Sequence, residues 1–188
     1  MVLIASGVLL FAFVHLFPAL FPARRQQLWD RIGEGGYKGL FSLGVAAGIV
    51  LIVVGWRSTV PATVYVPPPE LRHPAMALVV VAFWFMVLSG RPSRVKQWLR
   101  HPQLTGVFLW AVAHLAMNGD TRSVVLFSGL ALWSLLEIPL INHREGVWIK
   151  GSSPPLSKDI MTVGITAVVV VVLMHLHPWF AGMPVLVG

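Results

Sequence analysis

Three histidines and one glutamate lie within long apolar segments of this chain: His15, His114, His175 and Glu137. Ionisable side chains are costly at bilayer depth, so each of them is a candidate for binding or chemistry. Two neutral imidazoles on facing helices are the axial ligands that a buried b-type haem iron takes. The glutamate could instead pair with a loop arginine or orient His15.

His15 and His114 are expected at similar depths in the membrane. His15 lies six residues before Phe21, where its apolar run ends, so it is roughly 9 Å from that edge. His114 lies ten residues after Leu104, so it is roughly 15 Å from the same edge. These two are the candidate haem-iron ligands, whereas His175 is expected near the outer interface. The alternative is that the histidines only form hydrogen bonds between helices.

Six apolar runs must position these side chains, and they span 2–21, 39–56, 74–88, 104–117, 123–141 and 160–177. A helix needs about 20 mostly apolar residues to cross a bilayer. The third and fourth runs are short, so each is expected to extend through an amphipathic flank, such as 95–103 before the fourth. The proline- and glycine-rich segments 65–69 and 150–155 cannot be helix interiors and are expected to be loops.

The composition excludes a soluble protein. Of the 188 residues, 56% are hydrophobic and 11% are charged, against about 25% charged in soluble domains. Lipid must therefore replace water over most of the surface, and one membrane domain, 1–188, accounts for the whole chain. The absence of cysteine excludes disulfides and thiolate metal sites. The net charge of +7 does not indicate nucleic-acid binding, because the basic residues lie in short loops between apolar runs.

The distribution of Lys and Arg predicts the topology. Eleven of the 14 basic residues lie on one side of the expected spans, in the first, third and fifth connections: Arg24, Arg25, Arg31, Lys38, Arg91, Arg94, Lys96, Arg100, Arg144, Lys150 and Lys158. With an even number of spans, both termini are expected outside the cytoplasm.

The tryptophans and small residues have structural and functional interpretations. Trp84, Trp110 and Trp133 lie deep in their runs and either pack or line a pocket; packing is the expectation. Gly48 and Gly55, together with Gly44 and Ala47, are expected to let the second helix approach a neighbour closely.

Three segments carry a family resemblance. The first is Phe-Val-His-Leu-Phe-Pro at 13–18, which a basic turn follows. The second is Gly-Glu-Gly-Gly-Tyr-Lys-Gly-Leu-Phe-Ser-Leu at 33–43, and the third runs from Arg-His-Pro at 100–102 into Leu-Trp-Ala-Val-Ala-His-Leu-Ala-Met-Asn-Gly-Asp at 109–120. In this order and spacing they resemble the bacterial NnrU family, whose relatives include the plant zeta-carotene cis–trans isomerase. The resemblance covers about 5–145, whereas 146–188 departs from it.

This resemblance implies a bacterial inner-membrane protein linked to nitrite and nitric oxide metabolism. The plant isomerase carries a b-type haem held by two histidines, which match His15 and His114 here. In that enzyme the reduced iron is thought to lose one protein ligand and to bind the polyene. The cysteine that it carries three residues before its second ligand is Ala111 here, which argues against transferring a redox-dependent ligand switch.

Arg100, His101 and Pro102 have three interpretations. Membrane methyltransferases carry a similar motif that helps to hold S-adenosylmethionine, but the glutamate- and tyrosine-rich stretch that usually follows is mostly missing at 142–148. The motif also suits a helix start, because a proline early in a helix loses no hydrogen bond there. The third interpretation is that Arg100 and His101 make polar contacts to a cofactor or a lipid headgroup.

The sequence therefore predicts an all-α, polytopic membrane protein with about six transmembrane helices, embedded in the lipid bilayer. The leading hypothesis is an NnrU-like protein that binds haem b through His15 and His114. The alternatives are a haem-dependent isomerase of a lipophilic, carotenoid-like polyene, a methyltransferase-like protein, and a purely structural membrane subunit.

Overall fold

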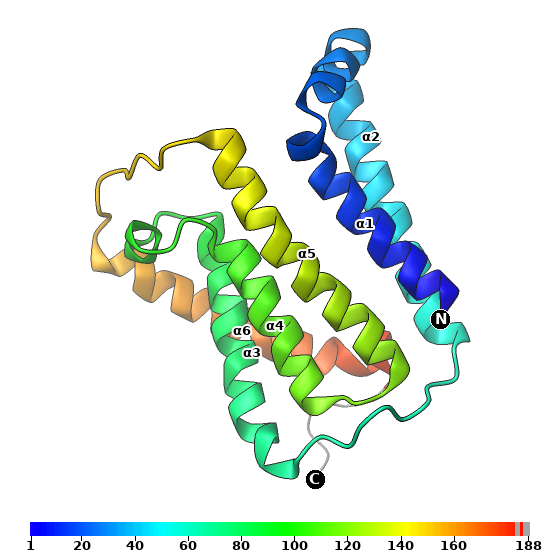
Figure 1. The fold of residues 1–188 in the computed structure, drawn as a ribbon. Coiled ribbons are helices and arrows are strands. Elements are labelled where there is room, and N and C mark those ends of the chain that lie inside the picture. Colours follow the sequence, from blue (N-terminus) through cyan, green and yellow to red (C-terminus); the bar gives the residue numbers. More distant parts are fainter. Residues whose placement is uncertain (183–184, 186–188) are drawn as a thin grey trace.

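The computed structural model describes residues 1–182 and 185 and consists of helices joined by short loops (Figure 1). The α-helices are α1 (Val2–Leu20), α2 (Pro22–Ser58), α3 (Arg72–Ser89), α4 (Pro102–Met117), α5 (Thr121–Glu145) and α6 (Leu156–Ala181). Two 3-10 helices, η1 (Pro69–Leu71) and η2 (Arg94–Gln97), precede α3 and α4. Five of the α-helices are long and apolar enough to cross a membrane, and α4 is a shorter apolar helix of 16 residues. The prediction of an all-α membrane protein with six apolar helices is confirmed.

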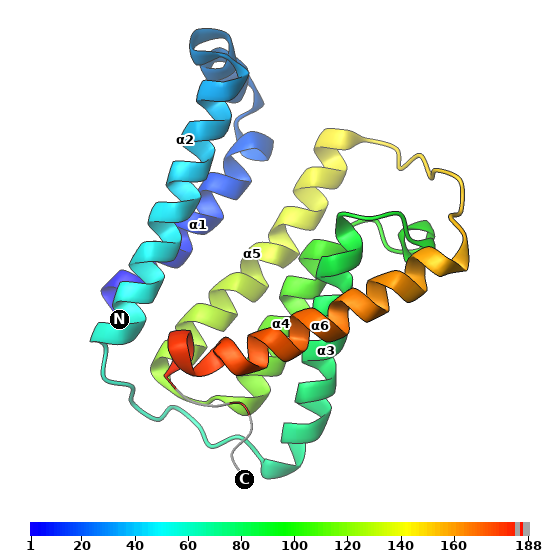
Figure 2. The same ribbon diagram turned by 180° about the vertical axis from the view of Figure 1, so that it is seen from behind.

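The helices form two groups that meet at α5. α1 and α2 are an antiparallel hairpin, and α1 also packs along α5. On the other side of α5 lies α4, which packs against α3, and α6 crosses α3 obliquely, in the foreground of Figure 2. Helices α1 and α4 thus contact two different sides of α5. The α1–α2 junction and the loops that follow α3 and α5 all lie at one end of the molecule.

Glycines set the close approach of α1 and α2, as expected from the small residues of the second run. A Cβ atom on Gly55 would lie 2.7 Å from the backbone nitrogen of Ile4, and one on Gly7 would lie 2.7 Å from the Gly48 carbonyl oxygen. Because only glycine leaves this space empty, the two backbones touch along most of α1.

The outer surfaces of the helices are apolar. Leu9, Ile160 and Val168 are each more than 60% exposed, although they belong to long apolar helices. Such a surface is unfavourable in water and favourable in lipid. The exposed side chains therefore support a lipid bilayer as the surroundings of the bundle.

The helix boundaries differ from the sequence prediction in two places. The segment 22–38, expected as a connection, is helical and belongs to α2, because Pro22 occupies a first-turn position and the ten residues after it contain neither proline nor glycine. This first part of α2 ends at Gly33, whose φ of 72° and ψ of 174° break the helix.

The second difference concerns 95–103, which does not extend the fourth apolar helix. η2 ends at Gln97, and α4 begins at Pro102 after His101 adopts φ −121° and ψ 64°. A residue that precedes proline is disfavoured in the helical conformation, so the proline separates the two elements. The loops expected at 65–69 and 150–155 are present, except that Pro69 opens η1.

Candidate functional site

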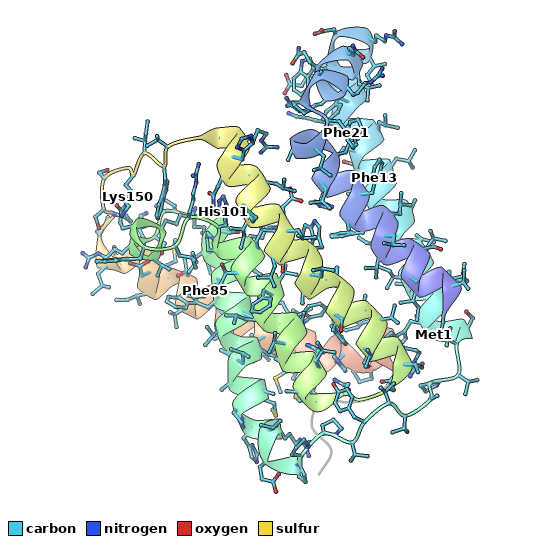
Figure 3. The ribbon with its side chains drawn as sticks, in the orientation of Figure 1. Met1, Phe13, Phe21, Phe85, His101 and Lys150 are labelled. Carbon is cyan, nitrogen blue, oxygen red and sulfur yellow. The ribbon has the colours of Figure 1, made fainter. Side chains whose placement is uncertain are left out.

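A cavity of about 1020 Å³ lies between α1, α3, α4 and α5. Its inner part is lined by aromatic and aliphatic side chains, including Phe11, Phe83, Val107, Leu130 and Trp133. We take as its mouth the end between the η2 segment and the loop after α5, where the lining includes five basic side chains: Arg91, Lys96, Arg100, His101 and Lys150. Figure 3 shows His101 and Lys150 at this end of the molecule. The cavity therefore combines an apolar interior with a cationic entrance.

His15 lines this cavity from α1. Its Nδ1 lies 2.8 Å from the carbonyl oxygen of Phe11, one turn earlier. A carbonyl can only accept, so Nδ1 carries the proton, and Nε2 of the neutral ring keeps its lone pair. The ring lies edge-on to Trp133, with centroids 5.0 Å apart, and to Phe41, with centroids 5.2 Å apart. These rings hold the imidazole beside the cavity.

His114 has the same backbone bond but a different position. Its Nδ1 donates to the Trp110 carbonyl oxygen at 2.8 Å, which again leaves Nε2 unprotonated in the neutral ring. The imidazole stacks on Phe127 of α5, with centroids 4.5 Å apart, and it also contacts the Trp110 ring at 4.6 Å. Trp110 lines the cavity and His114 does not. His114 therefore lies behind the Trp110 ring.

The two histidines flank one residue of the cavity floor. His15 contacts Trp133, and His114 contacts Phe127. On α5, Leu130 lies three residues after Phe127 and three residues before Trp133. At about 100° and 1.5 Å per residue, Trp133 and Phe127 point about 60° to either side of Leu130 and differ by about 9 Å along the axis. Because Leu130 lines the cavity, the ring that contacts His15 and the ring that contacts His114 project from α5 on either side of a cavity residue.

Glu137 supports the His15 side of the site. Its side chain is 5% exposed and lines the cavity. Oε2 accepts a hydrogen bond of 3.2 Å from Nε1 of Trp133, the ring that packs against His15. Glu137 makes no hydrogen bond to His15 itself, so its expected role in orienting His15 would act through Trp133, and both roles expected for Glu137 stay predictions.

Arg100 and His101 reach the last turn of α5. Nη1 of Arg100 donates to the Gly146 carbonyl oxygen at 2.9 Å, and its Nη2 lies 3.5 Å from Glu145 Oε2. Nε2 of His101 donates to Oδ1 of Asn142 at 2.8 Å. These contacts fix the start of α4 to the end of α5, which agrees with the helix-start interpretation. Both side chains also line the cavity mouth, and their contact with a cofactor stays a prediction.

The sequence did not reveal how the mouth is held in place. Asp159 of α6 accepts a hydrogen bond of 2.6 Å from Ser93 Oγ and one of 3.1 Å from the backbone nitrogen of Arg94. Ser93 and Asp159 are both buried. This bond ties α6 to the η2 segment, which carries Lys96 and the mouth. The two residues are 66 positions apart in the sequence, and no local sequence pattern predicts their pairing.

The family assignment follows from a comparison with family models. The model described as NnrU protein matches residues 2–185. The chain belongs to the NnrU family. The match extends beyond the region of about 5–145 that carries the quoted motifs, so α6 lies within the NnrU region. No curated protein and no solved structure gives a significant match.

Proposed function

We propose that this NnrU protein binds haem b in the cavity between α1, α4 and α5, with His15 and His114 as the axial ligands of the iron. The observation that carries the proposal is that the two imidazoles contact α5 rings on either side of the cavity residue Leu130, each with Nδ1 bound to a backbone carbonyl. That bond directs the Nε2 lone pair away from the helix backbone, which is how ligating histidines are commonly oriented.

The cavity lining fits the shape and charge of a haem. The porphyrin is flat and apolar, and the inner wall offers Phe11, Leu130 and Trp133. Its two propionates are anionic, and guanidinium and imidazole groups at the mouth, Arg100 and His101, suit planar carboxylates. When bound, haem would supply a redox-active iron that binds small gases. The chain itself would hold the porphyrin, orient the imidazoles and exclude water.

The position of His114 behind Trp110 sets a condition on this proposal. The Trp110 ring lies against the imidazole, with centroids 4.6 Å apart, and lines the cavity. For His114 to reach the iron, Trp110 must adopt another rotamer. His15 needs no such change, because it already lines the cavity. His15 is therefore the primary ligand in this proposal.

The test is the absorption spectrum of the protein purified in detergent after expression with a haem precursor. The wild-type protein is expected to show the spectrum of a six-coordinate, bis-histidine b-type haem, with the haem released intact by pyridine. H15A and H114A should each lose most of the bound haem. H175A is the matched control, because His175 has the same Nδ1 bond to a backbone carbonyl but lies on α6, a helix that contributes no residue to the cavity lining. A colourless wild-type protein, or equal haem content in all three variants, would contradict the proposal.

The biological role that we propose for this haem is in nitrite and nitric oxide metabolism, at the bacterial inner membrane, as an accessory or sensing factor. The support is membership of the NnrU family. Nitric oxide or carbon monoxide binding to the reduced protein would test whether one axial position opens. If neither gas changes the spectrum, the sensing role fails and electron transfer is favoured.

A second candidate function is a haem-dependent cis–trans isomerase of a lipophilic polyene. The observation that favours it is the extent of the cavity, which continues from His15 to Phe83 and Met86 on α3. Its volume of about 1020 Å³ is at the upper end for small-molecule sites, so apolar space remains beside a haem. Conversion of di-cis zeta-carotene by the haem-loaded protein, and its absence in H15A, would support this function over the accessory role.

A further inference from the structure

A second, smaller hollow lies at the junction of α1 and α2, away from the haem cavity. It measures about 270 Å³ and is lined by Phe17, Arg24, Gln27, Leu28 and Arg31. The last four lie at spacings of three, one and three residues, which places them on one face of the helical segment 22–32. Figure 3 shows the junction, marked by Phe21, beyond the end of α1 and apart from His101 and Lys150.

The basic residues of this junction fall into two groups. Arg25 and Lys38 are engaged within the protein: the Arg25 guanidinium lies over the rings of Trp29 and Tyr37, and Lys38 pairs with Glu34 at 2.6 Å. The other group faces the hollow and has no acidic partner among the described residues. Arg24 makes only a 3.4 Å bond to the Gln27 amide oxygen, and Arg31 makes none in the described part of the chain.

The hollow therefore places two uncompensated guanidinium groups above an apolar floor. Phe17 and Leu28 form that floor, at the end of a helix that is apolar enough to cross a membrane. A phosphodiester accepts charge-assisted hydrogen bonds from guanidinium groups, and an acyl chain suits the exposed apolar surface below them. We propose that this hollow binds an anionic phospholipid, with the phosphate between Arg24 and Arg31 and the acyl chains along Phe17.

This site would fix the depth of the segment 22–32 at the membrane surface. The segment is followed by the break at Gly33, so its orientation is not determined by the rest of α2 alone. A bound lipid that contacts both α1 and the segment 22–32 would join the two. The proposal does not depend on haem, because none of the five lining residues lines the larger cavity.

Native mass spectrometry of the full chain in detergent tests the proposal, with phosphatidylglycerol and phosphatidylcholine of identical acyl chains as the probes. The wild-type protein should retain phosphatidylglycerol in preference to phosphatidylcholine. A basic residue near an anionic lipid surface contributes about fivefold in affinity, so R24Q/R31Q should bind phosphatidylglycerol roughly 25-fold more weakly. The matched control R25Q/K38Q removes the same charge from residues that do not line the hollow and should change the affinity less than about fivefold.

Three outcomes would overturn the proposal. They are equal retention of the two lipids by the wild-type protein, equal loss in the two double variants, and full displacement of phosphatidylglycerol by millimolar inorganic phosphate. The last result would indicate an anion site without a lipid requirement. If circular dichroism shows that R24Q/R31Q has lost helical content, the single variant R31Q is used for the lipid-binding measurement instead. Because Arg31 is exposed and makes no hydrogen bond or ion pair within the described residues, its loss should lower the affinity about fivefold without unfolding the segment.

Discussion

Trp133 donates its indole N–H to Glu137, one turn later on α5, at 3.2 Å. Both side chains are buried, with exposures of 7% and 5%. The Trp133 ring also lies edge-on to His15, so the hydrogen bond holds the aromatic wall against the imidazole. A buried carboxylate in an apolar helix is costly, and this contact gives it a partner.

The first prediction is energetic coupling between these two residues. W133F leaves the Glu137 carboxyl group without its donor, and E137L leaves the indole N–H without its acceptor, which costs about 1–3 kcal/mol in each case. The double variant should be destabilised by less than the sum of the single variants, with a coupling of about 1 kcal/mol. Thermal unfolding in detergent measures it.

The control for this cycle is W110F combined with E137L. Trp110 also lines the cavity but packs against His114 and Phe127 rather than Glu137. These two substitutions should be additive. Additive effects of W133F and E137L as well would show that the hydrogen bond contributes nothing to stability.

The second prediction concerns the contact between α1 and α2. G55A places a methyl group 2.7 Å from the backbone nitrogen of Ile4, so α1 must move away, at a cost of about 1–3 kcal/mol. G39A adds the same group to the same helix where nothing lies within 4 Å. It should leave stability unchanged or raise it by up to about 1 kcal/mol, through helix propensity. Unfolding temperatures of the two variants test the difference, and equal temperatures would contradict this packing.

The third prediction concerns acid pH and Asp120, the N-cap of α5. Its carboxylate accepts hydrogen bonds from the backbone nitrogens of Arg122, at 2.9 Å, and Ser123, at 3.2 Å, and from Ser123 Oγ at 2.6 Å. Partial burial tends to raise the pKa of Asp120, but these hydrogen bonds and the charge of Arg122 outweigh it and hold the pKa below the ordinary value. The charged form is therefore stabilised in the folded protein.

The sign of the pH dependence follows from that shift. A carboxyl group whose pKa is lowered by folding contributes its full stability above the unfolded value, about 3.9. The contribution is lost as the pH falls through the lower pKa of the folded protein. Unfolding temperatures recorded below about pH 4 should fall less steeply for D120N, which keeps a capping oxygen but does not titrate. D120A should lose about 1 kcal/mol at neutral pH. Identical acid profiles for D120N and the wild-type protein would show that Asp120 is not responsible.

Much of the architecture was predictable because lipid imposes simple rules on a chain. A helix that crosses a bilayer must be apolar over about 20 residues, so the six apolar runs of the sequence located the six helices, although α4 is only 16 residues long. The exceptions arose where helix propensity, rather than hydropathy, decided the outcome. The segment 22–32 is polar and basic, yet it is helical because it has a proline at its start and lacks glycine before Gly33.

The candidate site was predictable only in part. The sequence identified His15 as a buried ionisable group, and the structure places it on the cavity wall. His114 was expected to face the same space directly, and its haem ligation stays a prediction, but Trp110 lies between the imidazole and the cavity. Side-chain layers of this kind depend on how helices are rotated against one another, which residue spacing within one helix does not specify.

By itself, the sequence determined that this chain is a bundle of apolar helices, that its motifs are those of the NnrU family, and which ionisable groups lie deep within it. Each of these properties depends on residue type and on local spacing along one helix. Tertiary structure alone decided that His15 and His114 contact α5 on either side of Leu130, that Trp133 connects Glu137 to His15, and that Ser93 meets Asp159. These are contacts between packed side chains, and all but the bond within α5 join distant segments. They follow from which faces of the helices meet.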